Sequence, residues 1–446
     1  MAATALAPNA DRARWRYGWP KSVGLAVGVG LLVRIADVLA TRHMRPVSDS
    51  WGYLLRGSYL QAHLRLWPIT HHGGTFPDAY WPPFFPATLA LIIELRSILL
   101  HLIPGAFVGL IAWTRLAMSV VGCATVAGVA LICDRLFGRR VAVTAAWITA
   151  LFPPMIDLGG SLYSESLLVP LMIGATAATV EYRRTRRRAL VPLAGVLTGL
   201  AALTHSDGIV LLLPLGAALW PSHRVSARGL MPLAVLVLSA ALMITPWTIR
   251  NAVVFHAFVP LSLSLGNTMA GTYNARSAST SPPAIWRKPN RLPDFRAIFR
   301  AHPVNTPAQD AALRDQAIHY LGRKISYLPT VVLFNTLHLL QFTEFRQSKA
   351  FVRRERSPLW TRYVADVSLW LLCLVGLAGC LTRAARRAPR WFWVIPGLIY
   401  LPVVLMGAAE ARFRSPVDPF IVILAACAIV AAAAHAPRRG LGRRVA

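Results

Sequence analysis

The chain has 446 residues, of which 55% are hydrophobic and 15% charged, and its formal net charge is +29. This composition excludes an ordinary soluble domain. The positive charge does not indicate nucleic-acid binding, because the arginines cluster in short loops between apolar runs, as they do on the cytoplasmic side of membrane proteins.

Ten apolar runs can be read as membrane spans, for which roughly 20 residues cross a hydrocarbon core of about 30 Å. They are 22–40, 107–133, 141–156, 164–181, 190–204, 206–220, 229–249, 364–382, 391–408 and 417–434. The sequence therefore predicts an all-α polytopic membrane protein with about 10–12 transmembrane helices.

The arginine-rich loops predict the orientation, because such loops stay in the cytoplasm. They are 134–140, 182–188, 383–390 and 437–444. The outer face then receives 41–106, 157–163, the turn near 205, 250–363 and 409–416. The predicted parts are a cytoplasmic leader (1–21) before a retained signal-anchor helix, a membrane core (22–249), an outer loop region (250–363), C-terminal transmembrane helices (364–434) and a basic cytoplasmic tail (435–446).

Two further apolar segments, 84–103 and 327–345, disturb the alternation if they are counted as spans. We expect both to be juxtamembrane helices on the outer side. The alternative for 327–345 is a span that places the basic stretch 346–362 in the cytoplasm and moves 383–390 outside. The count of basic residues in the cytoplasm favours the arrangement with ten spans.

The polar residues at the first outer loop can be interpreted either as structural groups of a helix start or as functional groups. Ser48 and Asp49 begin a helix-like stretch with Trp51, Leu54 and Leu55 on one face. Locally, this favours Ser48 as the N-cap and Asp49 as a first-turn anion on the helix dipole. Asp49 is also placed to act as a functional carboxylate. Nearby, the spacing of "RIAD" (34–37) predicts an i,i+3 ion pair between its arginine and its aspartate.

Further polar side chains gather at outer turns and span ends, where ionisable groups are costly and often functional. The candidates for substrate binding are Tyr53, Asp78, Tyr80, Asp157, Glu165, His205, Asp207, Arg250, Asn251, Glu410, Arg412 and Arg414. Arginine forks suit phosphate, and a carboxylate at a desolvated rim suits a general base. Together they indicate group transfer from a lipid-linked phosphate. Ligand spacing does not support a metal site, and we expect no cofactor.

Seven stretches carry a resemblance that runs from about residue 25 to 425. They are "LLVRIADVLATRHMRPVSDSWGYLLRGSYL", "YWPPFFPATLAL", "DRLFGRRVAVTAAWITALFPPMI", "SLYSESL", "GLAALTHSDGIVLLLP", "PWTIRNAVVFHAFVPLSLSLGN" and "ARFRSPVDPF". In order and topology, the sequence resembles the bacterial branch of the GT-C membrane glycosyltransferases, which includes protein O-mannosyltransferases and the lipid A aminoarabinose transferase.

The resemblance implies an activity and roles for individual residues. Asp49 would deprotonate an acceptor hydroxyl, which attacks C1 of a sugar on a polyprenyl phosphate and inverts the anomeric centre. Arg250, Arg412 and Arg414 match the arginines expected to hold the lipid phosphate, and Glu165 matches a carboxylate that shapes the sugar or acceptor pocket. The implied acceptor is a glycan, a glycolipid or a protein at the outer face of the plasma membrane.

The sequence departs from the family pattern at two places. Ser50 follows Asp49 where many relatives carry a second acid, which weakens the case for a metal. His205–Ser206 replaces a basic residue followed by proline, which puts phosphate binding by that turn in doubt.

Two other functions compete with the enzyme. A transporter or flippase of a lipid-linked substrate would place polar groups near the bilayer midplane and often shows inverted repeats. A non-catalytic scaffold would need no rim of carboxylates and arginines. The sequence shows its polar groups at one rim and no convincing repeat, and this favours the glycosyltransferase.

Overall fold

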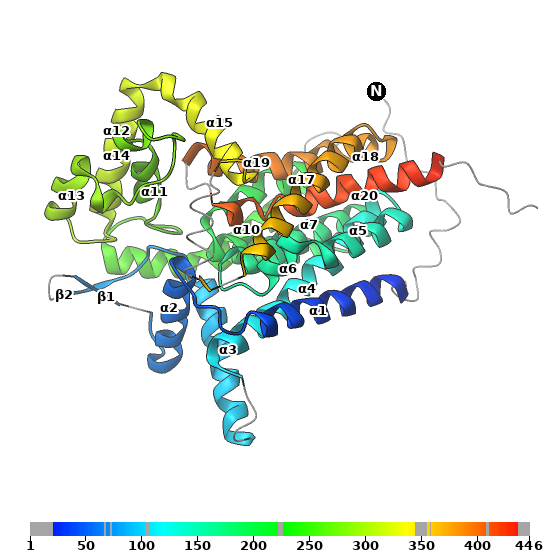
Figure 1. Cartoon of the computed structure of the whole chain (residues 1–446), viewed down its shortest axis with the longest axis horizontal. Helices are drawn as coiled ribbons and strands as arrows, with labels where there is room; N and C mark the ends of the chain where they lie inside the picture. The colour runs from blue at the N-terminus through cyan, green and yellow to red at the C-terminus, as the bar shows by residue number, and fades with distance from the viewer. Residues whose placement is uncertain are drawn as a thin grey trace, which may run out of the picture.

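The computed structural model describes residues 21–66, 68–71, 74–103, 108–221, 226–343, 355–356, 358–406 and 410–435. Within them, a bundle of helices runs along the long axis of the molecule, and smaller elements gather at one end (Figure 1). Almost all of the expected leader and the expected basic tail lie outside the described residues.

All ten predicted spans fall on helices of the bundle. These helices are α1 (Lys21–Ala40), α4 (Leu110–Leu136), α5 (Arg139–Leu151), α6 (Pro153–Gly159), α7 (Glu165–Thr185), α8 (Leu190–Thr204), η2 (Ser206–Leu211), α9 (Leu212–Leu219), α10 (Ala227–Phe255), α17 (Leu359–Cys380), α19 (Arg390–Met406) and α20 (Asp418–His435). The short helix α18 (Arg383–Arg387) lies in the predicted basic loop between α17 and α19. The chain is a multi-pass membrane protein.

The described helices differ from the expected 10–12 uniform spans in length. Six of them (α1, α3, α4, α10, α17 and α20) are long and apolar enough to cross a membrane, and the pair α5–α6, bent by 63°, makes a seventh. Helices α8, α9 and α19 are apolar but shorter. Proline explains the bend, because Pro153 and Pro154 begin a new helix where α5 ends.

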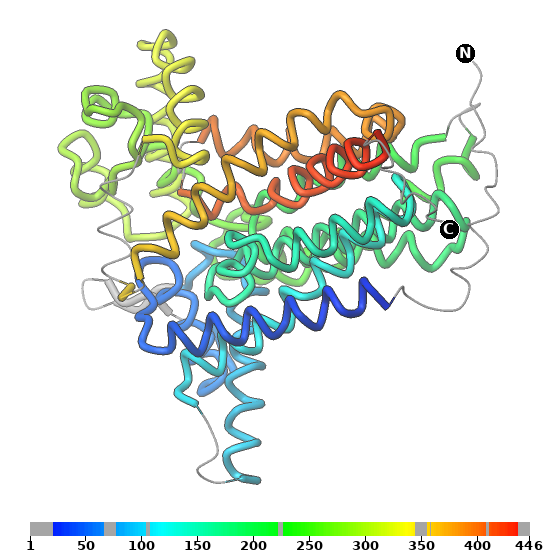
Figure 2. The backbone as a smooth tube through the Cα atoms, turned by 45° about the vertical axis from the view of Figure 1, so that its right-hand side comes forward, coloured from blue at the N-terminus to red at the C-terminus, as the bar shows by residue number. Residues whose placement is uncertain are grey.

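Helix α3 (Phe84–Leu102) has the length and hydropathy of a span but not the direction of one. Figures 1 and 2 show it running crosswise to the bundle, at the end where the smaller elements lie. Helix α2 (Asp49–His63) lies against it. This geometry agrees with the expected juxtamembrane position of 84–103.

The remaining elements belong to the same end of the bundle. They are the antiparallel hairpin β1 (Pro68–His71) and β2 (Gly74–Pro77), in the register Ile69 opposite Phe76, then α11 (Leu265–Thr272), α12 (Ala275–Ala278), η3 (Pro289–Arg291), η4 (Pro293–Phe295), α13 (Arg296–Ala301), α14 (Pro307–Arg323), η5 (Ile325–Tyr327), α15 (Leu328–Leu339) and η6 (Ala411–Arg414). We call this the polar end. The opposite end carries the loops 134–140, 182–188 and 383–390 and is called the basic end (Figure 1).

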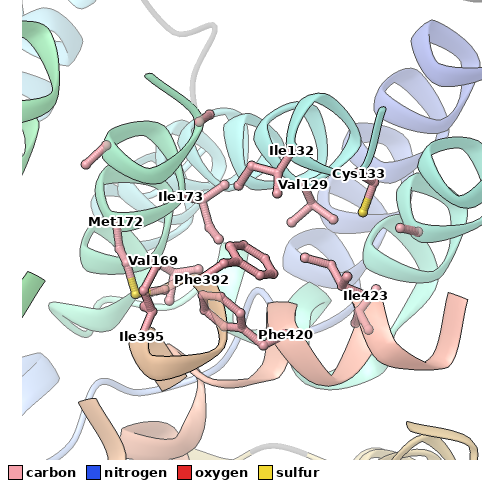
Figure 3. Close-up of a cluster of buried hydrophobic side chains, with 14 of the residues drawn as sticks. Val129, Ile132, Cys133, Val169, Met172, Ile173, Phe392, Ile395, Phe420 and Ile423 are labelled. Atoms are coloured by element: carbon pink, nitrogen blue, oxygen red, sulfur yellow. The ribbon is translucent and has the colours of Figure 1, made fainter. Parts of the chain in front are cut away.

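The bundle core joins helices that are far apart in the sequence. Figure 3 shows Phe392 and Phe420 between α19 and α20, with Ile173 of α7 and Val129 of α4 facing them. The two phenylalanine rings are 5.2 Å apart. Burying each such side chain contributes about 1.5–3 kcal/mol in a water reference, and close packing is what holds helices together within lipid.

A second, smaller core stabilises the elements between α11 and α15. Tyr273, Phe295, Leu313 and Val331 are buried in it. The carboxylate of Asp310 on α14 accepts a 2.7 Å hydrogen bond from the backbone N–H of Gly266. Residues 265–331 therefore form a compact unit, which we call the end domain.

Two buried arginines correct the expected Arg34–Asp37 pair. Arg34 donates to the carbonyl oxygens of Ala150 (3.2 Å) and Met155 (3.0 Å), on either side of the break between α5 and α6. Asp37 instead lies 3.6 Å from the guanidinium of Arg115 on α4. The i,i+3 prediction is wrong because Pro153 and Pro154 have no N–H to offer the carbonyl groups of Thr149 and Ala150, and Arg34 donates to both of these carbonyls.

Candidate functional site

Arg412 lies at the centre of a cluster of carboxylates at the polar end. Its guanidinium forms ion pairs with Asp49 at the start of α2, with Glu165 at the start of α7 (3.5 Å) and with Glu410 (2.7 Å). Three segments that are remote in sequence thus meet at one cation. Four of the predicted site residues are brought together here.

Aromatic rings fix the orientation of this arginine. The guanidinium carbon of Arg412 lies 4.4 Å from the ring centroids of both Tyr163 and Phe413. Burial alone lowers the pKa of Arg412, but the charges of Glu165, Glu410 and Asp49 outweigh that effect and raise the pKa above its ordinary value. Arg412 therefore stays a cation with a fixed plane.

The three carboxylates around Arg412 differ in exposure. The side chain of Glu165 is 1% exposed, that of Asp49 is 32% exposed and that of Glu410 is 51% exposed. Burying a charge is costly unless it is paired, so Glu165 depends on Arg412 most strongly. Glu410 forms a surface-type ion pair, which is weak and easily exchanged.

The local structure at Asp49 differs from the predicted helix cap. Ser48 makes no side-chain capping bond, and its φ of 55° lies in the left-handed region, which is strained for a residue other than glycine. Ser50 instead accepts from the backbone N–H of Val47 (3.0 Å) and donates to its carbonyl (2.7 Å). Asp49 is the first residue of α2, as expected, but its carboxylate bonds to Arg412.

A chain of hydroxyl groups connects α2 to α7. Tyr53 donates to Ser164 (3.2 Å), and Ser164 donates to Glu165 (3.3 Å). Burial raises the pKa of Tyr53, and the charges of Asp49 and Glu165 add to the shift, so its phenol stays protonated and remains a donor. Tyr53 therefore lies at the candidate site and orients Glu165.

Glu355 is a carboxylate of the site that sequence reasoning did not select. It accepts a 3.3 Å hydrogen bond from Tyr163, the residue whose ring covers Arg412, and its backbone carbonyl accepts from the N–H of Arg45 (2.9 Å). Burial raises the pKa of Glu355 to about 8, and the charge of Asp157 adds to the shift. Glu355 therefore lies at the polar end, close to Tyr163 and Arg45.

A second group of predicted residues forms a network of hydrogen bonds and ion pairs beside the Arg412 cluster. Asp78 pairs with Arg56 of α2 and accepts from the N–H of Tyr80 (2.7 Å). Arg250 donates to the carbonyl of Asp78 (3.1 Å) and to the side chain of Asn251 (2.8 Å). These bonds join the segment after β2 to α2 and α10.

Tyr80 connects this network to the end domain and lies near Asp49. Its hydroxyl accepts a 2.8 Å hydrogen bond from Asn267 on α11. Burial raises the pKa of Tyr80. The charge of Asp49 raises it further, because the two side chains are close enough to interact.

Three of the remaining predicted residues have partners outside the Arg412 cluster. Arg414 is buried and donates to Asp418 (2.8 Å) and to the carbonyl of Leu339. His205 lies 3.5 Å from Asp207. The His205 ring is also 6.0 Å from that of Phe413, so this turn borders the aromatic cover of Arg412. Of the three predicted phosphate-binding arginines, Arg412 alone is paired with Asp49.

Sequence signals for the residues that were not selected are uneven. Glu355 is the one acidic residue in the basic stretch 346–362, and Tyr163 belongs to the "SLYSESL" landmark. Both signals were present in the sequence. Nothing in the spacing of Phe413 or Arg115 reveals that the first would stack on its neighbour and the second would pair with Asp37.

The described residues contain no group of three or more His, Cys, Asp or Glu side chains arranged to hold a metal ion. Asp49, Glu165 and Glu410 surround the guanidinium of Arg412, which supplies positive charge to all three.

Solved structures with the same arrangement of helices identify the fold. An oligosaccharyltransferase from Archaeoglobus fulgidus in its apo form matches with a TM-score of 0.55 at 15% identity, covering 92% of this chain and 50% of the other. The AglB oligosaccharyltransferase of the same organism, in complex with an inhibitory peptide and a dolichol-phosphate, matches with a TM-score of 0.53 at 14% identity, covering 92% and 50%. The chain has the GT-C fold.

Two other comparisons match part of the chain or match it with a lower TM-score. A model of the dolichyl-phosphate-mannose-protein mannosyltransferase family matches residues 110–249, from α4 into α10. ArnT from Cupriavidus metallidurans bound to undecaprenyl phosphate matches with a TM-score of 0.45 at 16% identity, covering 92% of this chain and 78% of the other. No curated protein sequence matches the chain. The chain spans about half the length of the two oligosaccharyltransferases that share its fold.

Proposed function

We propose that this protein is an inverting glycosyltransferase. It moves a sugar from a polyprenyl phosphate to an acceptor hydroxyl at the outer face of the cytoplasmic membrane. The observation that carries this proposal is the direct pairing of Asp49 with Arg412 at the polar end, which puts a proton acceptor beside a cation suited to phosphate. The GT-C fold and the match of 110–249 to the mannosyltransferase family support it.

In the reaction, the ionised carboxylate of Asp49 takes the proton of the acceptor hydroxyl. The acceptor oxygen attacks C1 of the sugar from the side opposite the phosphate and forms the new glycosidic bond. The bond between C1 and the phosphate oxygen breaks, and the polyprenyl phosphate leaves with the electron pair. Arg412 stabilises the charge that develops on this leaving group.

Binding of the donor phosphate requires one carboxylate to leave Arg412. Glu410 is the carboxylate to be displaced, because its side chain is half exposed and a surface pair contributes at most about 1 kcal/mol. Glu165 stays in place, because it is buried and also accepts from Ser164. In this arrangement Glu165 holds the guanidinium and borders the sugar, as the family resemblance implies.

The position of the charged groups favours transfer over transport. Asp49 and Glu165 begin helices, and Arg412 lies in the turn before α20, so all three lie at one end of the bundle. A transporter of a lipid-linked substrate would place its binding groups midway along the helices.

The test uses membranes that contain the wild-type protein or Asp49→Asn, supplied with one polyprenyl-phosphate sugar at a time. Release of sugar from the lipid should fall about 10²- to 10⁴-fold in the variant, as expected for loss of a general base. Asp315→Asn, at an exposed residue of α14, is the matched control. Equal rates for wild type and Asp49→Asn would rule out Asp49 as the base.

A further inference from the structure

An apolar groove opens at the polar end, beside the junction of α1, α2 and α4. Its volume is about 580 Å³, within the usual range for ligand sites. Leu39 of α1, Trp51 and Leu55 of α2, and Gly109 and Ile111 at the start of α4 line it. Since α1 and α4 have the length of membrane spans, the groove lies where a membrane helix meets the interface.

Arg42 supplies a cation at the rim of this groove, with the imidazole of His43 beside it. Arg42 and His43 line it and are exposed, and the Nε of Arg42 is 3.3 Å from the Nε2 of His43. No carboxylate among the described residues forms an ion pair with either side chain. An apolar wall with an unneutralised cationic rim fits a lipid with an anionic headgroup.

Helix α2 separates the groove from the Arg412 cluster. Trp51 and Leu55 face the groove, whereas Asp49 and Tyr53 face Arg412 and Glu165. A donor phosphate held at Arg412 therefore occupies the other side of α2. His43 precedes Asp49 by six residues and the groove-lining Trp51 follows it by two, so a headgroup at the rim lies beside the segment that carries the proposed base.

We propose that this groove binds the acceptor, and that the acceptor is a long-chain lipid with a phosphate headgroup. This inference rests on the proposed function. The chain would lie against Leu39, Leu55 and Ile111, and the phosphate would contact Arg42 and His43. The sugar or alcohol attached to that phosphate would present its hydroxyl to Asp49 from the side opposite the donor. The enzyme thus holds two lipids, one on each side of α2.

The groove can be filled without disturbing the surrounding structure. A Cβ atom built on Gly109 has no heavy atom within 4 Å, and its φ of −56° is ordinary for any residue. Gly109→Phe therefore places a ring in the groove. Gly24→Phe is the matched control, because Gly24 on α1 is equally open and does not line the groove. Arg42→Glu reverses the charge of the rim, with Arg291→Glu in the end domain as its control.

Native mass spectrometry with undecaprenyl phosphate as the probe counts the bound lipids. Wild type and Gly24→Phe should bind two, and Gly109→Phe and Arg412→Ala should each bind one. Arg42→Glu should weaken the site that remains in Arg412→Ala at least tenfold. An unchanged count in Gly109→Phe overturns the inference, as does equal binding of phosphatidylglycerol, which would make the groove a site for bulk lipid.

Kinetics separate this inference from the proposed function. With the sugar donor and a membrane lipid extract as the source of acceptor, Gly109→Phe should lose transfer at least tenfold and keep the KM for donor. A raised donor KM would assign the groove to the donor chain and overturn the acceptor role. If the wild type releases no sugar while the lipid counts change as expected, the proposed function fails and the phosphate-lipid site stands.

Discussion

Arg412 donates from Nη2 to the Oδ2 of Asp49 across 363 positions of sequence. The bond joins the turn before the last helix of the bundle to the first outer loop, and Glu165 of α7 completes the contact from the other side. Four predictions follow from this cluster, from its neighbour Glu355 and from the hydrogen bonds that Arg34 donates across the break between α5 and α6.

Arg412→Ala should raise the KM for donor and lower kcat about a hundredfold, as expected for loss of a preorganised donor to developing charge. Arg187→Ala, at the basic end, should change neither value. Because the substitution leaves Glu165 buried without its cation, it should also cost about 3–5 kcal/mol of stability. The double variant Arg412→Ala/Glu165→Gln should recover the melting temperature but not the activity. Recovery of both would leave Arg412 with a structural role alone.

Glu410→Gln should have the opposite effect on donor binding. Removing the most exposed partner of Arg412 frees one face of the guanidinium for phosphate, so the KM for donor should fall by up to about fivefold. Steady-state kinetics with varied donor measure the change. A rise in KM would show that Glu410 binds the substrate instead of competing with it.

Arg34→Leu should destabilise the protein although it replaces a charged group with an apolar one. The carbonyl oxygens of Thr149 and Ala150 lose their donor, and each unsatisfied group costs about 1–3 kcal/mol. Gly159→Ala should act in the same direction, because its Cβ would lie 2.6 Å from the Nε of Arg34. Melting temperatures in detergent measure both, with the exposed Arg65→Leu as the control. An unchanged melting temperature in Arg34→Leu would show that these hydrogen bonds do not stabilise the fold.

The stability of the fold should fall as the pH rises toward 8, through Glu355. Its pKa rises from an ordinary value of 4.5 to about 8 in the folded protein, mainly because of burial. Between these values the folded state binds more protons than the unfolded state, so stability decreases as pH increases. Glu355→Gln keeps the contact with Tyr163 without the titration, and its melting temperature should fall less than that of wild type between pH 5 and pH 8. Parallel curves for the two proteins would remove Glu355 as the source.

The sequence predicts the helices well because membrane spans follow from apolar length alone. All ten predicted runs fall on helices, and 84–103 lies crosswise, as its charges Glu94 and Arg96 indicate. The predictions that Ser48 caps α2 and that Arg34 pairs with Asp37 are wrong, since each considered only local spacing. A partner from another helix replaced the local one in the second case, and spacing along one helix cannot reveal it.

The members of the candidate site could be selected from the sequence, but their arrangement could not. Asp49, Glu165, Glu410 and Arg412 were all selected from their places at span ends, and they meet. Arg414, two positions beyond Arg412, points elsewhere because η6 rotates the chain between them and Asp418 lies one helical turn further on. Sequence distance does not distinguish these two arginines, and only their partners do.

The hydrogen bonds of Arg34 to the α5–α6 break also affect the order in which the bundle can assemble during synthesis. Two of its carbonyl acceptors lie 116 and 121 residues further along the chain, at the α5–α6 break. When α1 leaves the ribosome and enters the bilayer, those acceptors have not been synthesised. Until the α5–α6 segment is made, the groups on α1 that can stabilise the Arg34 cation are the Gly30 carbonyl and the charge of Asp37. Assembly of the bundle thus depends on the α5–α6 segment. In a ribosome-bound chain truncated before residue 150, α1 should pack less firmly against the other helices.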